Sequence, residues 1–219
     1  MIVFMDSWIF IFVILIFSAI LHEYAHGLAA YMQGDSTAKD MGRLTFNPIP
    51  HIDPFYTLLL PAIMIVLPTN FIIGGAKPVP VNPFNLRGKY AEMKVALAGP
   101  LSNLALATLF GLMIRFVPVI TQNTSLFIAF GAVVFVNLLL AVFNLFPIPP
   151  LDGSHVLFAL IPGIARPVKI FFAQYGLFIF FAVIFLFAPY VFGLIFTLIS
   201  ILFYPITGIS LLDFLSLIS

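Results

Sequence analysis

Cysteine is absent from this sequence of 219 residues, and charged residues are scarce. Without cysteine the chain cannot form a disulfide, so a bound metal ion would be held by nitrogen and oxygen ligands. Charged residues make up 8% of the sequence, whereas a soluble domain has about 25%. The net charge is only +1, which gives no case for a nucleic-acid partner. The sequence therefore predicts an integral membrane protein that has no nucleic-acid partner.

Apolar segments account for most of the chain, which is 63% hydrophobic. A helix that crosses a membrane needs about 20 mostly apolar residues, and five segments meet this requirement: 7–32, 94–118, 126–148, 168–188 and 190–212. A sixth segment, 54–73, carries Pro61 and Pro68 and ends at Gly74 and Gly75, a composition that suits a broken or re-entrant element. We therefore predict an all-α integral membrane fold. It is a polytopic helical bundle of five to six transmembrane segments, with a short re-entrant or β-hairpin-like element around residues 74–93.

Positively charged residues predict how this bundle is oriented, because they favour the cytoplasmic side of a membrane. If the N-terminus lies outside and 54–73 adds no net crossing, then 33–53, 76–93 and the link before residue 168 are cytoplasmic. Eight of the nine Lys and Arg lie in these regions or at the segment ends that border them: Lys39, Arg43, Lys77, Arg87, Lys89, Lys94, Arg166 and Lys169. Only Arg115 falls outside. We therefore expect the C-terminal end of the first apolar segment to lie near the cytoplasm.

The most informative motif lies inside that first apolar segment, where residues 22 to 26 are His-Glu-Tyr-Ala-His. Ionisable side chains at this depth are costly to insert, so they indicate a functional site. On a helix, His22 and His26 share one face and can bind the same metal ion. Glu23 lies beside them, where it can take a proton from a metal-bound water. This spacing indicates a zinc hydrolase, whereas a purely structural polar network would leave too much unpaired polarity.

A catalytic zinc usually has three protein ligands and a water molecule, so one ligand is still missing. The best candidate is Asp152, which follows the inward end of the segment 126–148. Pro147 and Pro149 would break the helix just before it and turn the carboxylate into the bundle. From spacing alone, a loop carboxylate that caps the following helix explains Asp152 equally well.

His51, Asp53 and His155 are the other candidate ligands. His51 and Asp53 lie among prolines, so a turn at the membrane surface explains them as well as a role in orienting the ligands does. His155 lies one turn beyond Asp152 and is better explained as a surface or capping histidine.

Five blocks of sequence carry a more specific pattern: His22-Glu-Tyr-Ala-His26, Asn47-Pro-Ile-Pro-His51-Ile-Asp53, Gly75-Ala-Lys-Pro78-Val-Pro80-Val-Asn82-Pro83, Gly99-Pro100-Leu-Ser-Asn103 and Asn144-x-x-Pro147-x-Pro149-x-x-Asp152-Gly153. Together they resemble the compact prokaryotic branch of the site-2 protease family of intramembrane zinc metalloproteases, in which we expect no PDZ or nucleotide-sensing domain. The resemblance implies that His22, His26 and Asp152 bind one zinc ion and that Glu23 is the general base. It also favours Asn144 as an oxyanion donor or substrate clamp, with Asn103 as a weaker candidate.

The resemblance implies an endopeptidase that cuts a membrane protein in or near a transmembrane segment, as in regulated intramembrane proteolysis. We expect one domain over 1–219, with a catalytic core at about 7–153 and accessory helices at about 168–212. The expected partners are the lipid bilayer and a transmembrane protein substrate. The expected location is a prokaryotic plasma membrane, with the active site toward the cytoplasm; the oligomeric state stays open. The alternative is a membrane metal-ion transporter with the same side chains as a transit site, but the repeated halves common in transporters are absent.

Overall fold

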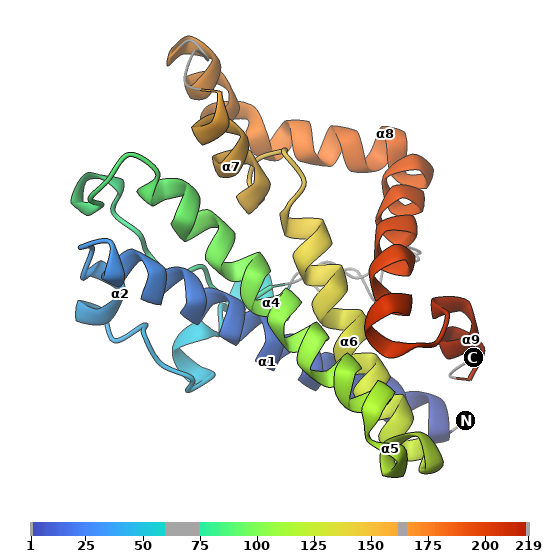
Figure 1. Ribbon diagram of the computed structural model, residues 1–219. Helices are drawn as coiled ribbons and strands as arrows, with labels where there is room; N and C mark the ends of the chain where they lie inside the picture. Colours follow the sequence, from blue (N-terminus) through green and yellow to red (C-terminus); the bar gives the residue numbers. More distant parts are fainter. Residues whose placement is uncertain (1, 60–74, 162–165, 218–219) are drawn as a thin grey trace. The chain divides into compact units, whose positions relative to one another are not determined.

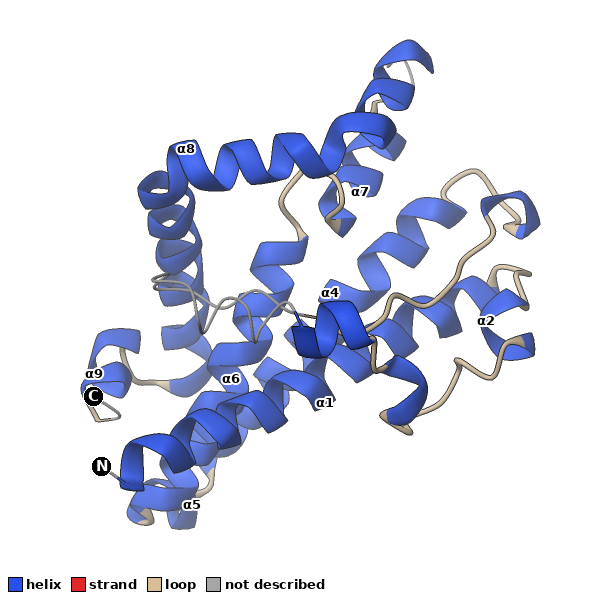
Figure 2. Cartoon of the chain, turned by 180° about the vertical axis from the view of Figure 1, so that it is seen from behind, coloured by secondary structure: helices blue, strands red, loops and turns tan. Residues whose placement is uncertain are grey.

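The computed structural model describes residues 2–59, 75–161 and 166–217. All regular elements within these ranges are helices (Figure 1 and Figure 2), which confirms the all-α prediction for the described part of the chain. The chain forms two compact units, Met1–Gly99 and Pro100–Ser219. The boundary between these units falls inside helix α4 (Ala91–Phe116). The single catalytic domain stays a prediction.

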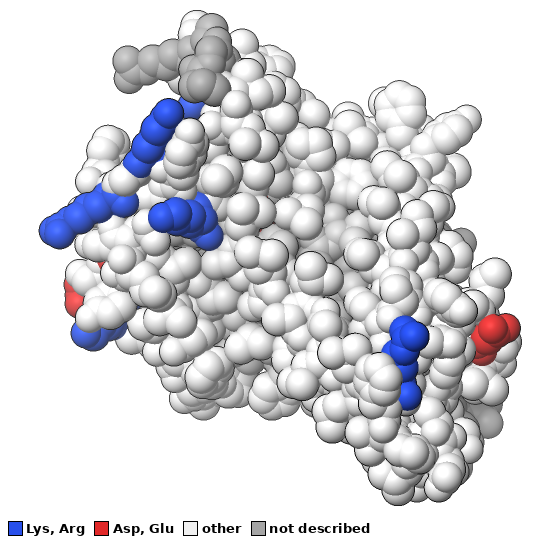
Figure 3. All heavy atoms as spheres, in the orientation of Figure 1, with Lys and Arg blue, Asp and Glu red and all other residues white. Residues whose placement is uncertain are grey.

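Four helices among the described residues are long and apolar enough to cross a membrane: Phe10–Met32 within α1, the whole of α4, the whole of α6 (Thr124–Asn144) and Gln174–Thr207 within α8. The face drawn in Figure 3 carries few charged side chains, and most of it is uncharged. Lipid tails can cover such a surface without leaving charges unpaired. The chain is therefore a multi-pass membrane protein, as the composition predicts.

The first unit begins with the long helix α1 (Ile2–Met32). Gly34 follows with φ +100°, a left-handed conformation that glycine adopts freely and that commonly ends helices. Three short helical elements come next, namely α2 (Thr37–Asp40), η1 (Ile49–His51) and η2 (Pro54–Leu59). Most of the predicted sixth segment, from residue 60 to 73, lies outside the described residues.

The region predicted as a re-entrant or hairpin-like element is described from residue 75 onward. Residues 75–82 are neither helix nor strand, Asn82 is extended, and the short helix η3 (Pro83–Asn85) follows. Prolines interrupt the row of N–H donors that a strand ladder needs. A β-hairpin is therefore not present in 75–93, while a re-entrant course stays a prediction.

The second unit contains the rest of α4, then α5 (Pro118–Gln122), α6, α7 (Asp152–Leu160), α8 (Arg166–Thr207) and α9 (Leu211–Ser216). Its core is apolar and includes Leu138, Phe203 and Phe214, all fully buried. Gly131 lets the ring of Phe214 approach closely, because a Cβ there would lie 2.6 Å from Phe214 Cζ. One buried hydrogen bond crosses this apolar core, from Asn103 Nδ2 to Asn137 Oδ1 at 2.9 Å.

Helix α8 differs from the prediction of two separate segments, 168–188 and 190–212. It is one element of 42 residues with non-helical angles at Phe187, φ −122° and ψ 18°, and Figure 1 shows the sharp bend. The bend lies two residues before Pro189. A proline inside a helix removes a hydrogen bond and clashes with the preceding turn. The expected link is thus a kink between two helical arms.

Candidate metal centre

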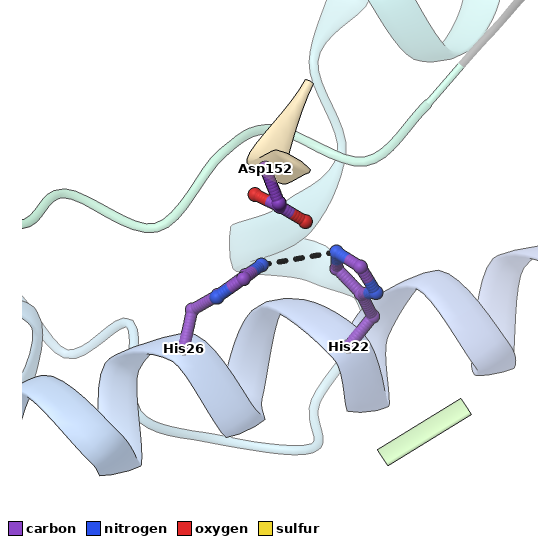
Figure 4. Close-up of side chains that lie close together, drawn as sticks. All are labelled: His22, His26 and Asp152. Carbon is purple, nitrogen blue, oxygen red and sulfur yellow. Dashed lines mark hydrogen bonds between the residues drawn. The ribbon is translucent and has the colours of Figure 1, made fainter. Parts of the chain in front are cut away.

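Two imidazoles converge on one face of α1. His22 and His26 are 6% and 8% exposed, and their Nε2 atoms lie 3.0 Å apart (Figure 4). The rings meet edge to face, with centroids 4.6 Å apart. Two nitrogens bound to a tetrahedral zinc ion, each at about 2.0–2.1 Å, lie about 3.3 Å from one another. The helix therefore presents two nitrogen ligands at close to the spacing that one ion needs.

A backbone carbonyl orients the second imidazole. His26 Nδ1 lies 2.7 Å from the carbonyl oxygen of Val95 in α4. A carbonyl oxygen only accepts hydrogen bonds, so Nδ1 carries the proton and Nε2 keeps its lone pair for a metal. Ligand histidines commonly have such a partner for the other ring nitrogen. The sequence could not identify Val95, because any residue type can supply a backbone carbonyl.

Gly99 brings the backbone of α4 directly against the two ligand nitrogens. A Cβ at this position would lie 2.6 Å from His22 Nε2 and closer still to His26 Nε2. Any side chain would therefore occupy the space in front of the lone pairs. In the sequence, Gly99 was noted only as part of the Gly99–Asn103 block. The structure explains why a glycine is required there: no side chain fits in front of the two ligand nitrogens.

Glu23 is held by a backbone amide from a distant part of the chain. The N–H of Val79 donates to Glu23 Oε2 at 2.7 Å. Val79 is buried, and Glu23 is half-buried. One carboxylate oxygen of the predicted base thus has a fixed partner.

In the second unit, Asp152 is the first residue of α7, and its carboxylate leaves the first turn of that helix (Figure 4). The cap position before it belongs to Leu151, which makes no side-chain cap, so Asp152 does not serve as the N-cap. The backbone turns tightly here, because a Cβ at Gly153 would overlap the carbonyl of Leu145. The side chain is partly exposed, which leaves a carboxylate able to act as an oxygen ligand.

The remaining predicted residues make contacts within their own units. His51 is buried, and its Nε2 donates to the carbonyl of Thr45 at 2.9 Å. The backbone N–H of Asp53 donates to Thr57 Oγ1 at 3.0 Å. Asn144 Nδ2 donates to the carbonyl of Leu140, one turn back in α6, at 2.9 Å.

Asn103 and His155 were also named as candidates from the sequence. Asn103 is fully buried beside Asn137, as described above. His155 is exposed on α7, in agreement with its interpretation as a surface histidine.

The sequence did not predict the role of Asp35, a buried residue of the first unit. Asp35 is 0% exposed, and its carboxylate accepts hydrogen bonds from the N–H groups of Thr37 and Asn82 and from the side chains of Thr37 and Asn85. Burial by itself would raise the pKa of Asp35, but these hydrogen bonds outweigh it and lower the pKa below the usual 3.8. A single aspartate after an apolar helix gave no signal of this role.

An apolar multi-helix chain with two converging histidines and an adjacent glutamate defines a membrane metallopeptidase. The model of peptidase family M50 matches residues 118–187. The Bacillus subtilis protein YwhC, named as a zinc metalloprotease, is 39% identical over 178 residues, which are 78% of this chain and 78% of YwhC. Rip2 of Mycolicibacterium smegmatis, also named as a zinc metalloprotease, is 33% identical over 156 residues, or 69% of this chain and 58% of Rip2.

This chain belongs to the site-2 protease family, peptidase family M50. The predictions of the family and of a metalloendopeptidase are thereby confirmed. The names of the relatives agree with the predicted zinc cofactor. No solved structure matches the chain significantly.

Proposed function

We propose that this protein is an intramembrane zinc endopeptidase that hydrolyses a peptide bond in or near a transmembrane segment of a membrane protein. The observation that carries this proposal is the pair of Nε2 atoms 3.0 Å apart on α1, inside a helix able to cross a membrane. A glutamate next to the first histidine adds the group that hydrolysis requires. Regulated intramembrane proteolysis is the corresponding biological process.

The proposed ligands are His22, His26 and Asp152, each of which offers one ligand atom. Two imidazole nitrogens and a carboxylate oxygen fit the donor set of catalytic zinc. The support for Asp152 is its place at the start of α7, where it is not the cap, and its place in the Asn-x-x-Pro family block. When bound, zinc would lower the pKa of a coordinated water to about 7 and polarise the substrate carbonyl.

The side chains of this chain have separate proposed roles. Glu23 accepts a proton from the attacking water, while Val95 keeps the ring of His26 in the tautomer that binds metal. Asn144, with its amide at the end of α6, donates to the developing oxyanion or clamps the substrate. Asn103 is a weaker candidate for the same role, and its hydrogen bond to Asn137 favours a structural role.

The loop residues of the first unit are proposed to act indirectly. His51 and Asp53 support the cavity around the ligands rather than binding the metal. We propose that the described chain from residue 75 to 93 belongs to a re-entrant element that shapes the active site. A helical substrate must be locally extended before its carbonyls can react, and an extended segment of the enzyme could pair with it.

The membrane placement is also a proposal. The active site faces the cytoplasmic side of a prokaryotic plasma membrane, because Lys and Arg concentrate in the loops that this orientation places inside. The two arms of α8 then cross separately on either side of Phe187.

A metal-ion transporter is not favoured, because the family is one of peptidases.

The substitution Glu23→Gln tests the proposed chemistry. It should leave one zinc ion per chain and reduce hydrolysis by about 10²–10⁴-fold, the usual contribution of a general base. Zinc content by atomic absorption and cleavage of fluorescein-labelled casein in detergent provide the readouts. Glu92→Gln is the matched control, because Glu92 is exposed at the start of α4, and it should behave as wild type.

Substrate identification follows from the same pair of proteins. Membranes that contain the wild-type enzyme should accumulate a protein fragment that is absent with Glu23→Gln, and mass spectrometry of that fragment would give the substrate and the cleavage position. Unchanged casein cleavage by Glu23→Gln would remove Glu23 from the reaction.

A further inference from the structure

The hydrogen bond from Val79 to Glu23 joins two residues that are 56 positions apart in the sequence. Its donor is a backbone N–H, so it belongs to the course of the chain rather than to a side chain. Val79 is 7% exposed, which shields the bond from competing water. A short, buried bond to one carboxylate oxygen restricts the rotation of the whole carboxylate.

The extended segment Lys77–Asn82, here called the strap, is fixed on the near side of Val79. The N–H of Lys77 donates to the carbonyl of His51 at 2.8 Å. The guanidinium of Arg43 donates from Nη2 to the carbonyls of Lys77 and Pro78, at 2.8 and 3.3 Å. Arg43 is itself buried. The loop 33–53 therefore holds this end of the strap through both side-chain and backbone bonds.

The strap is fixed on the far side as well. The N–H of Asn82 donates to Asp35 Oδ2 at 2.7 Å, and Asn85 Nδ2 donates to Asp35 Oδ1 at 3.0 Å. Burying a carboxylate or a guanidinium is costly unless hydrogen bonds compensate it. Both buried charges form hydrogen bonds with the strap: Arg43 donates to its carbonyls, and Asp35 accepts from the N–H of Asn82. Two buried polar anchors therefore hold one short piece of extended chain.

Prolines make Val79 the one donor at the centre of the strap. Pro78 and Pro80 have no N–H and fix their own φ angles, and each disfavours a helical conformation in the residue before it. The amide of Val79 is thus presented from a stiff, extended backbone. This arrangement suits a group whose direction must be constant.

We infer that the strap is a positioning device for Glu23 and that the backbone N–H of Val79 is its working group. The inference rests on the proposed function, in which Glu23 accepts a proton. By holding Oε2, the strap fixes the plane of the carboxylate and hence the direction of its other oxygen. The same N–H cannot pair with a substrate backbone while it is bonded to Glu23, so the device acts on the rate of reaction and not on substrate affinity.

Val79→Pro removes this single donor while it keeps the extended backbone that the neighbouring prolines already impose. We expect one zinc ion per chain, an unchanged KM for labelled casein within about 2-fold and a kcat about 10–100-fold lower, part of the general-base contribution. Val81→Pro is the matched control, because it makes the same change two residues further along the strap. It should keep kcat within about 2-fold of wild type.

A binding measurement separates positioning from activity. Acetohydroxamate is titrated into the cobalt-loaded enzyme, and its binding is followed by the visible absorption of Co²⁺. This probe has no peptide portion that could contact the strap, and its hydroxyl can donate a hydrogen bond to Glu23. Val79→Pro should weaken this binding several-fold in the wild-type background and leave it unchanged in Glu23→Gln, since coupled residues are non-additive.

The outcomes distinguish this inference from the proposed function. A higher KM with unchanged kcat in Val79→Pro would show that the N–H of Val79 pairs with substrate and would overturn the positioning role, with the proposed chemistry intact. Failure of the proposed function would instead appear as full activity of Glu23→Gln. If Val79→Pro does not fold, Asp35→Asn tests the inference instead, because it weakens the hydrogen bonds from Asn82 and Asn85 that hold the far end of the strap. It should lower kcat several-fold with zinc and KM retained, and an unchanged kcat would overturn the inference.

Discussion

The two units of this protein are stabilised in different ways. In the first unit, buried or half-buried polar side chains bind backbone groups of distant segments: His26 to Val95, Glu23 to Val79 and Asp35 to Asn82. In the second unit, the core is built of Leu, Ile, Val and Phe side chains, and a pair of asparagines crosses it. Polar contacts therefore position chemical groups in the first unit, whereas apolar packing stabilises the second unit.

The largest effect is expected from a break in the apolar packing of the second unit. Phe214→Ala removes a buried ring that contacts Phe127 and Phe203, and a change of this type usually lowers the free energy of unfolding by about 3–5 kcal/mol. Reversible unfolding in mixed micelles measures the loss. The folded fraction should still bind zinc, and a variant that is stable but has lost zinc would contradict the separation of roles. Leu212→Ala, at an exposed position on α9, is the control.

The second-largest effect is a loss of zinc affinity, expected when the space beside the two histidines that Gly99 leaves open is filled. Gly99→Ala places a methyl group against both ligand nitrogens, so zinc affinity should fall by about 100-fold, the upper range for changes beside metal ligands. This corresponds to about 2.7 kcal/mol. Zinc titration against a chelator of known affinity gives the value.

Gly111→Ala is the matched control for that change. It adds the same methyl group to the same helix, but there the new Cβ would meet the side chain of Ile206 in the second unit. This variant should lose stability and keep its zinc affinity. Equal losses of zinc in both variants would mean that Gly99 serves ordinary helix packing.

A smaller effect is expected from the polar pair inside the apolar unit. Asn103→Ala removes the hydrogen bond from Asn103 Nδ2 to Asn137 Oδ1 and should lower the free energy of unfolding by about 1–2 kcal/mol. Hydrolysis by the folded enzyme should stay within about 2-fold of wild type, because the amide of Asn103 binds another helix. A fall in kcat with unchanged stability would instead support Asn103 as an oxyanion donor.

The smallest effect concerns the pH dependence of the first unit. The pKa of Asp35 is lower in the folded state than the usual 3.8, so its contribution to stability is complete above 3.8 and is lost as the pH falls through the folded value. Unfolding measured from pH 5 downward should therefore show a loss of stability that begins near pH 3.8 and is absent in Asp35→Asn. Asp40→Asn, at an exposed position in α2, should keep the wild-type profile.

The sequence predicted the parts of the site that depend on periodicity and residue type. The spacing of His22 and His26 places both imidazoles on one helical face, and apolar length located α1, α4 and α6 within a few residues. It did not predict Val95 or Val79, because their backbone groups have no residue signature. Asp35 was missed because hydrogen bonds formed only in the fold compensate its burial. The kink at Phe187 was expected as a loop, since Pro189 marks an interruption without showing whether the helix resumes.

The most direct test of the account is the zinc content of Asp152→Asn compared with His155→Ala, one turn further along α7. We expect Asp152→Asn to purify folded with much less than one zinc ion per chain, while His155→Ala retains one. Full zinc occupancy in Asp152→Asn, at wild-type affinity in a chelator titration, would contradict the proposed ligand set.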